Sequence, residues 1–173
     1  MTSSQQKIQV FALGGTIDKV YFDALSEYQV GEPQVGSIFK EAGLGIEFQI
    51  TSICSKDSLE ITEDDREKLR QAVLAAKQSH ILITHGTDTM TVTAQFLKDT
   101  QDSAIKNKTI VLVGSMNPAC FKNSDAPFNV GFALGALQAS APGIYIAMNG
   151  SIFTPETVRK NREAKQFQHI SDQ

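Results

Sequence analysis

The chain has few cysteines, and their spacing suggests neither metal nor disulfide chemistry. Cys54 and Cys120 are the two cysteines among 173 residues, and they form no CxxC pair. Zinc sites and disulfide frameworks are recognised by several closely spaced cysteines. The sequence therefore argues against both, and we expect Cys54, at the end of an apolar segment, to be a small core residue.

A dense block of positive charge is also missing. The formal net charge is −3, whereas nucleic-acid-binding domains usually gather positive charge on one face. We therefore expect no nucleic-acid partner. One basic group is interrupted by Glu163, and we interpret it as a solvated face with one exception that is given below. Its members are Arg159, Lys160, Arg162 and Lys165.

Long apolar runs are absent as well. Met1 to Lys7 is polar, unlike the apolar region of a secretory signal, and no segment approaches membrane-spanning length. We therefore expect a cytoplasmic protein with no membrane partner. Hydrophobic residues make up 41% and charged residues 20% of the chain, which is typical of a soluble globular protein. The length fits one domain over residues 1–173.

Apolar segments alternate with helical patterns along the chain. The predicted strands are 8–13, 46–54, 80–84, 109–113 and 143–148. The predicted helices are Val35–Ala42, a segment that begins at Thr62, Thr91–Lys98 and Phe128–Ala139. This alternation predicts a single α/β domain with a doubly wound, mostly parallel sheet and helices on both faces.

Two segments show little periodicity. Asp18 to Gln34 is long for a loop in a compact domain, and we expect either a lid or a poorly ordered stretch. The segment from Gly150 onward is polar after Phe153, and it either folds back over the sheet edge or frays.

Two threonine motifs follow predicted strands, Gly14-Gly15-Thr16-Ile17 and Thr84-His85-Gly86-Thr87-Asp88-Thr89. The carboxyl ends of parallel strands face one crevice, where ligands bind. The glycines allow a tight turn and leave room for a ligand. A threonine hydroxyl is a weak nucleophile that needs a neighbouring base or cation. Alone, Gly-Gly-Thr is more often a plain or phosphate-contacting turn.

The second threonine motif is more specific. Helix N-capping explains one of its polar residues but not all of them. Asp88 is a candidate to bind a substrate ammonium, and Thr87 offers a second hydroxyl. His85 has two interpretations, a general base or a packed, hydrogen-bonded residue, and its position beside a glycine favours the second. Further polar turns at Ser55–Ser58 and Gly114–Pro118 favour one shared site for a small zwitterion.

These motifs resemble those of the bacterial-type L-asparaginases, which hydrolyse an amide through threonine nucleophiles. Leu13–Ile17 is similar to the first signature of that family, although the family more often has threonine where Leu13 stands. Ile83–Met90 is similar to the second signature. Gly114–Pro118 and Ser124–Asn129 are similar to the VGAMRP and SADGPFN segments, so the resemblance covers essentially the whole chain.

The resemblance implies roles for individual residues. Thr16 would be the nucleophile that forms an acyl-enzyme, and Tyr28, preferred over Tyr21, would be the lid tyrosine that hydrogen-bonds to it. Thr87, Asp88 and Lys160 would form a second set. Lys160, preferred over Arg159, would lower the pKa of the Thr87 hydroxyl or activate water. The implied substrate-binding residues are Gly15, Ser55 as carboxylate ligand, Lys56, Gly86, and Ser115 through its carbonyl.

The chain departs from the family in two respects. Lys56 stands where many members have glutamine, so we expect it either to repel a substrate ammonium or to turn toward the carboxylate. The family also has a second, smaller domain, which supplies an acidic residue to the neighbouring site in dimers, and the chain ends where that domain would begin. We therefore expect a more open pocket and a weaker grip on the ammonium. Exposed apolar surface predicts a homo-dimer or homo-tetramer.

The leading prediction is an amidohydrolase that converts L-asparagine to L-aspartate and ammonia through a threonine acyl-enzyme, with no cofactor or metal. Glutamine or a larger amide is an alternative substrate. A catalytically inactive amino-acid sensor is an alternative of a different class. A nucleotide-binding domain is least supported, because no G-x-G-x-x-G follows the first strand.

Overall fold

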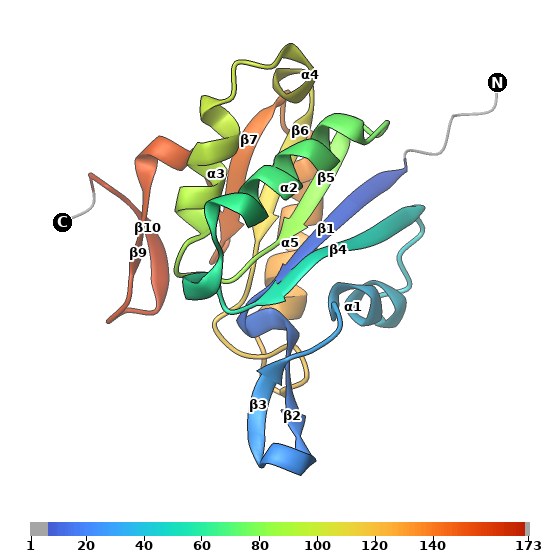
Figure 1. The fold of residues 1–173 in the computed structure, drawn as a ribbon, viewed down its shortest axis with the longest axis vertical. Coiled ribbons are helices and arrows are strands. Elements are labelled where there is room, and N and C mark those ends of the chain that lie inside the picture. The colour runs from blue at the N-terminus through green and yellow to red at the C-terminus, as the bar shows by residue number, and fades with distance from the viewer. Residues whose placement is uncertain (1–6, 172–173) are drawn as a thin grey trace.

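A six-stranded sheet forms the centre of the computed structural model, which describes residues 7–171 (Figure 1). Its strands lie in the order β4-β1-β5-β6-β7-β8, and every neighbouring pair is parallel except β7 with β8. The bounds are β1 (Ile8–Gly14), β4 (Phe48–Lys56), β5 (His80–Thr84), β6 (Thr109–Val113), β7 (Gly143–Met148) and β8 (Ser151–Phe153).

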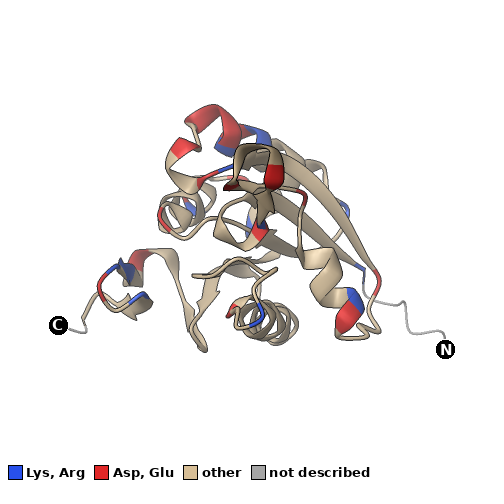
Figure 2. Ribbon diagram, turned by 90° about the horizontal axis from the view of Figure 1, so that it is seen from below, with Lys and Arg blue, Asp and Glu red and all other residues tan. Residues whose placement is uncertain are grey.

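Helices cover both faces of this sheet, with α2 and α3 on one face and α1 and α5 on the other (Figures 1 and 2). The bounds are α1 (Val35–Glu41), α2 (Glu63–Ala75), α3 (Met90–Asp99), α4 (Ser103–Lys106) and α5 (Ala126–Ala139). Thr62 caps α2 by accepting the Asp65 N–H, and the Asp65 carboxylate accepts the Thr62 N–H in return, which satisfies two backbone donors. The predicted α/β fold class is confirmed.

The central strands are buried on both sides, which explains their continuous apolar sequences. All five residues of β6 are buried, as are four of the five in β5. Helices cover both faces of a parallel sheet, so such strands show no alternation of polar and apolar residues. Each fully buried large aliphatic side chain contributes about 1.5–3 kcal/mol. The core thus fixes the strands that carry the two threonine motifs.

The strand order places both threonine motifs at one point. The chain passes from β1 outward to β4 and then returns to add β5 on the other side of β1. In doubly wound sheets ligands bind outside the carboxyl ends of the strands at this reversal. Thr16 follows β1 and Thr87 follows β5, so the fold brings them together from distant parts of the sequence.

Two antiparallel hairpins extend from the sheet, and neither was predicted in detail. Hairpin β2–β3 consists of β2 (Lys19–Phe22) and β3 (Glu27–Val30), and it accounts for most of the segment expected to be a lid or poorly ordered. Hairpin β9–β10 consists of β9 (Val158–Asn161) and β10 (Gln166–His169). The segment after Gly150 therefore folds back instead of fraying. In Figure 1 the first hairpin projects at the bottom and the second lies beside α3.

Within residues 7–171, none of the helices has the length and apolar character that crossing a membrane would require. Residues 1–6, whose polarity contributed to the predicted cytoplasmic location, lie outside the described part of the chain.

Candidate active site

The backbones of the two threonine motifs touch at two glycines. A Cβ atom on Gly15 would lie 2.3 Å from the Gly86 Cα, and one on Gly86 would lie 2.5 Å from the Ser58 Cβ. Gly15 also has φ 87°, a conformation that residues with side chains rarely adopt. The two glycines are therefore needed for the close approach that sets Thr16 beside Thr87. The Gly15 N–H already donates to the Lys56 carbonyl (2.9 Å), so Gly15 offers space rather than a donor.

One cavity of about 350 Å³ opens at this point. Its lining residues are Thr16, Thr87, Asp88, Met116, Asn117, Lys160, Arg162 and Lys165. Four of the five residues predicted to be catalytic, namely Thr16, Thr87, Asp88 and Lys160, thus meet in one place. Thr87 is buried, while Thr16 is half-buried and its hydroxyl has no hydrogen-bond partner among the described residues.

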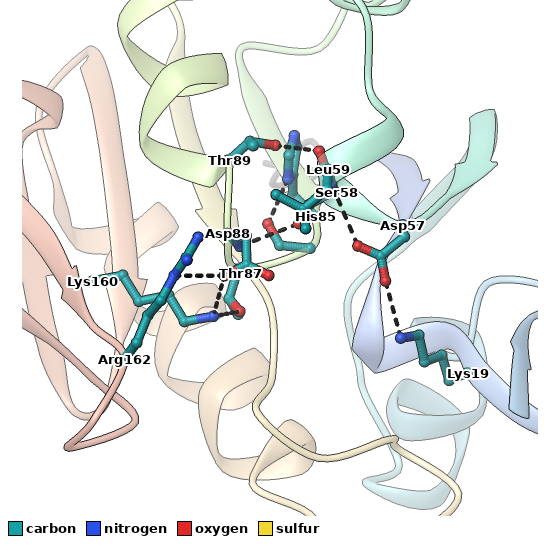
Figure 3. Close-up of polar contacts among 11 residues, drawn as sticks. Lys19, Asp57, Ser58, Leu59, His85, Thr87, Asp88, Thr89, Lys160 and Arg162 are labelled. Carbon is teal, nitrogen blue, oxygen red and sulfur yellow. Dashed lines mark hydrogen bonds and ion pairs between the residues drawn. The ribbon is translucent and has the colours of Figure 1, made fainter.

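Lys160 joins the second motif from the opposite end of the chain (Figure 3). Its Nζ donates to the Thr87 Oγ1 (2.7 Å) and to the Asp88 Oδ1 (2.8 Å). The lysine side chain is only 17% exposed, so water screens this ion pair less than it would screen a surface pair. A cation that donates to a hydroxyl oxygen stabilises negative charge on that oxygen. Lys160 is thus the basic residue that donates to Thr87.

The basic group around Lys160 is more than a solvated face. Arg162 is exposed, yet its Nε lies 3.5 Å from the same Asp88 oxygen, and both Arg162 and Lys165 line the cavity. Sequence reasoning missed these two residues because charged positions in a polar segment give no sign of the direction in which they point. The turn between β9 and β10 brings them to the site.

His85 is a packed residue, as the second interpretation of the sequence expected. It is fully buried, with Nδ1 2.7 Å from the Gly86 carbonyl and Nε2 2.8 Å from the Thr93 hydroxyl. The carbonyl can only accept, so Nδ1 carries the proton and Nε2 accepts from Thr93. Burial lowers the pKa of His85 to about 4. His85 is therefore neutral near pH 7 and fixes the turn.

Ser58 is a third residue that sequence reasoning did not assign to the site. It is buried, its Oγ accepts the Asp88 N–H (3.2 Å), and its carbonyl accepts the Thr89 hydroxyl (2.6 Å). These contacts tie the end of β4 to the second motif (Figure 3). Strand β4 runs two residues further than predicted, to Lys56, so the serine that packs against the motif is Ser58.

Six of the ten predicted site residues are not among the described residues that line the cavity, namely Gly15, Tyr28, Ser55, Lys56, Gly86 and Ser115. Ser55 is an exposed residue of β4, and Lys56 pairs with Asp65 at the start of α2 (Nζ–Oδ2 2.7 Å). The Lys56 ammonium is thus paired with a carboxylate of the protein, and its hydrogen bond lowers the pKa of Asp65 to about 2. Tyr28 is 48% exposed on hairpin β2–β3. Its ring contacts those of Tyr21 and Phe121, each with centroids 5.4 Å apart.

The loop after β6 forms another part of the cavity wall. Asp125 shapes it by accepting the N–H groups of Met116 (2.8 Å) and Asn117 (2.9 Å). The predicted ligand Ser115 is buried, and its hydroxyl donates to the Asn117 carbonyl (2.5 Å). The side chain of Ser115 therefore supports the loop. Across residues 7–171 no group of three or more metal-ligating side chains is placed to hold an ion.

The fold and the site define the chain as a doubly wound α/β domain with hydroxyl, lysine and aspartate side chains at the switch point of its sheet. The chain belongs to the asparaginase family, because the model for "Asparaginase, N-terminal" matches residues 7–171.

Its relatives include an L-asparaginase from Thermococcus kodakarensis, 36% identical over 163 residues, or 89% of this chain and 47% of that protein. A glutaminase-asparaginase from Acinetobacter glutaminasificans is 32% identical over 146 residues, or 82% of this chain and 41% of that protein. The solved structure of the thermostable Thermococcus kodakarensis L-asparaginase superposes with a TM-score of 0.82 at 31% identity, covering 96% of this chain and 52% of that one. The chain thus spans about half the length of these relatives.

Proposed function

We propose that this chain hydrolyses the side-chain amide of L-asparagine to give L-aspartate and ammonia. The observation that carries the proposal is the convergence of two threonine hydroxyls in one cavity, with Lys160 joining Thr87 to Asp88. Membership of the asparaginase family supports it. The names of the relatives supply the substrate.

The proposed reaction has two steps. In the first, the Thr16 oxygen attacks the amide carbon, the hydroxyl proton passes to the leaving nitrogen, and ammonia departs as an ester forms on Thr16. In the second, water attacks that ester, which releases the free acid and restores the hydroxyl. Splitting one difficult step into two easier steps is the advantage of a covalent intermediate.

Thr87 and Lys160 would assist proton transfer in these steps. The Lys160 ammonium donates to the Thr87 oxygen, so the Thr87 proton is free to bond to a ligand in the cavity. The Asp88 carboxylate stabilises the cation by accepting from it. Positioned proton-transfer groups contribute about 10²–10⁴-fold to rate. Tyr28 as the partner of Thr16, and Gly15, Ser55, Lys56, Gly86 and Ser115 as substrate ligands, stay predictions.

Replacement of each threonine tests the proposal. We expect Thr16→Ala and Thr87→Ala each to lower ammonia release from L-asparagine by roughly 10³-fold or more, because each removes a reacting group. Thr91→Ala is a matched control in the same part of the chain, since Thr91 is not among the described residues that line the cavity, and we expect a change below about twofold. Thermal unfolding checks that all three variants fold.

Trapping distinguishes the covalent route. Hydroxylamine added during turnover intercepts an ester and yields the hydroxamate of aspartate, and the Thr16→Ala variant should give none. Full activity in Thr16→Ala or in Thr87→Ala would remove that threonine from the mechanism. Protein that binds aspartate but releases no ammonia from any amide would be an amino-acid sensor.

Glutamine is a second candidate substrate, because one relative is named a glutaminase-asparaginase. An extra methylene in a pocket changes discrimination by only ~1–3 kcal/mol. The ratio of kcat/KM for the two amino acids measures the preference, and a higher value for glutamine would assign the chain as a glutaminase.

We also propose that the chain forms homo-oligomers through the face of α5. This helix contains no charged residue, and a helix that is apolar on all sides is normally buried. Phe128 is nevertheless 63% exposed, and Gly131 and Gly135 leave open space beside it. We expect a dimer or tetramer mass by light scattering, and Phe128→Asp should shift it to the monomer. A monomer mass for the unchanged protein would contradict this proposal.

A further inference from the structure

A buried arginine lies near the second threonine motif and takes no part in the steps proposed above. Arg66, on α2, is only 8% exposed. Among residues 7–171 it forms no ion pair with a carboxylate. Its Nε donates to the Oγ1 of Thr93 (3.1 Å), a fully buried residue of α3. Burying a cation is costly unless other groups compensate its charge, so the position of this side chain has to have a physical reason.

Hydrogen bonds connect Arg66 to the backbone beside Thr87. The Thr93 Oγ1 lies 2.8 Å from the His85 Nε2, and the His85 Nδ1 lies 2.7 Å from the Gly86 carbonyl oxygen. Side chains from α2, α3 and the turn after β5 thus form one buried chain of hydrogen bonds. This chain ends at the carbonyl of the peptide bond that links Gly86 to Thr87.

The chemistry of its members gives the hydrogen-bond chain a single direction. A guanidinium can only donate, and a carbonyl oxygen can only accept. The Thr93 oxygen therefore accepts from Arg66, and the Thr93 proton goes to the His85 Nε2. The His85 Nδ1–H then donates to Gly86. Hydrogen bonds that point the same way strengthen one another, and the charged donor at the start makes a bond roughly twice as strong as a neutral one.

Arg66 also acts on the protonation of His85. Burial is the main cause that lowers the pKa of His85 to about 4, the hydrogen bond with Gly86 opposes it, and the positive charge of Arg66 adds to the lowering. A protonated ring carries an N–H at both nitrogens, so it could not accept from Thr93. Arg66 thus favours the neutral ring that the hydrogen-bond chain requires.

We infer that Arg66 is a positioning residue for the proposed reaction and holds the Gly86–Thr87 peptide in place. It acts through Thr93 and His85, since neither Arg66 nor Thr93 is among the described residues that line the cavity. This inference rests on the proposed function. A displacement of 1 Å in a reacting group lowers a rate by about 10²-fold, so the support behind Thr87 affects turnover.

Kinetics of three variants test this role. Arg66→Met removes the charge and the donor but keeps an apolar stem, and Thr93→Val removes the hydroxyl at nearly constant shape. We expect each to lower kcat for ammonia release from L-asparagine about tenfold, with KM within about twofold. The double variant should also lose only about tenfold, because groups in one network do not act additively. Arg70→Met, on the same helix, is the control and should stay within about twofold.

A spectroscopic measurement tests the hydrogen-bond chain without turnover. Nitrogen-15 NMR distinguishes the two ring nitrogens of a histidine, and the variants His80→Gln and His169→Gln assign the signals of the three histidines. We expect the His85 proton on Nδ1 at neutral pH, and a His85 pKa that rises in Arg66→Met but not in Arg70→Met. A proton on Nε2 instead would reverse the chain and overturn the inference.

A conservative variant separates positioning from folding. Arg66→Lys keeps a cationic donor, so it should retain more of kcat than Arg66→Met and leave the His85 pKa low. Thermal unfolding shows whether each variant folds, and if Arg66→Met does not, Arg66→Lys and Thr93→Val supply the same comparison. A kcat for Arg66→Met within about twofold of the unchanged protein would contradict the inference.

These measurements also keep the inference separate from the proposed function. If His85 responds to Arg66 as expected but no amide releases ammonia, the proposed function fails and the positioning of the peptide by Arg66 stands. If L-asparagine is hydrolysed and neither kcat nor His85 responds to the loss of Arg66, the inference fails and the proposed function stands.

Discussion

The two hairpins that extend from the sheet are attached to the core in different ways. Hairpin β9–β10 contributes two buried apolar side chains, Val158 (5% exposed) and Phe167 (4%). Hairpin β2–β3 contributes none, since its residues are half-buried at its base and exposed toward its tip. Burial of a large apolar side chain contributes about 1.5–3 kcal/mol. Hairpin β9–β10 is therefore held to the core by its buried side chains, whereas hairpin β2–β3 is held mainly by its base.

The two hairpins also differ in the side chains that they contribute to the cavity, in line with how firmly each is attached. Hairpin β9–β10 holds Lys160 at hydrogen-bonding distance from Thr87 and Asp88. Hairpin β2–β3 carries Tyr28, which is not among the described residues that line the cavity. A catalytic group held in place before the reaction costs nothing to position during it. A group on a loosely attached hairpin is suited to close after the substrate has bound.

The largest expected effect is at the anchored hairpin. Lys160→Met should lower ammonia release by about 10²–10⁴-fold, because it removes the cation that contacts Thr87 and leaves Asp88 without its closer partner. Arg159→Met, one residue earlier on β9, should retain most of the activity, since neighbouring strand residues point to opposite faces. Steady-state kinetics on both variants measure the contrast. A near-normal rate for Lys160→Met would shift the role to Arg159 or to a site without lysine.

The base of hairpin β2–β3 should respond to pH. The Asp18 carboxylate is buried, one oxygen accepts the Gln34 N–H (2.8 Å), and the other has no partner among the described residues. Burial raises the pKa of Asp18 from 3.8 to about 7, and Glu32 adds to the rise. Between pH 3.8 and about 7 the Asp18 carboxyl is protonated in the folded state and ionised in the unfolded state. The protonated carboxyl therefore stabilises the fold at low pH, and this stabilisation is lost as the pH rises through about 7.

Asp18→Asn removes this dependence. Above the folded pKa we expect the free energy of unfolding of this variant to exceed that of the unchanged protein by about 2 kcal/mol. The whole pKa difference corresponds to ~4 kcal/mol, and the gain is smaller because the asparagine amide must also be desolvated. Asp23→Asn, at the exposed end of the same hairpin, should change little. Urea unfolding over a series of pH values measures both. A lower stability for Asp18→Asn above the folded pKa would show that the charged form is the one that the fold favours.

A smaller effect is expected at the tip of the same hairpin. Tyr28→Phe should lower kcat about tenfold if the hairpin closes over Thr16, since one hydrogen bond to a reacting group is worth ~1–2 kcal/mol. Tyr21 lies directly opposite Tyr28 in the hairpin register, so Tyr21→Phe is the matched control and should stay within about twofold. The reverse order of effects would make Tyr21 the lid residue.

The smallest expected effect concerns the ion pair at the base of hairpin β2–β3. Lys19 Nζ lies 3.0 Å from Asp57, with both side chains partly exposed, and such pairs contribute at most ~1 kcal/mol. Lys19→Met should therefore lower the free energy of unfolding by about 0.5 kcal/mol at low salt and by less at high salt. Lys122→Met serves as the control without this partner. A loss of several kcal/mol would mean that this ion pair contributes far more than a partly exposed pair normally does.

The sequence was a reliable guide where structure is repetitive and buried. The predicted strands 80–84, 109–113 and 143–148 match β5, β6 and β7, because a strand covered on both faces must be apolar throughout. The threonine motifs were found for a similar reason. Glycines at strand ends mark tight turns, and parallel strands direct those turns to one edge.

The same reasoning failed where short polar segments pack through a few distant contacts. Two buried side chains of hairpin β9–β10 decide where Arg162 and Lys165 point, and that information is not local. Ser58 was passed over because β4 continues to Lys56, and the end of a strand depends on its neighbour in the sheet.

The sequence by itself determined the parallel sheet and the two glycine–threonine turns. Local apolar runs and glycine positions carry that information, because burial and backbone conformation act residue by residue. Only the tertiary structure decided which side chains share the cavity, since the attachment of each hairpin depends on contacts between residues far apart in the chain. The tertiary structure brings three cations of hairpin β9–β10 to a cavity that contains one carboxylate, and Tyr28 is not among the described residues that line it.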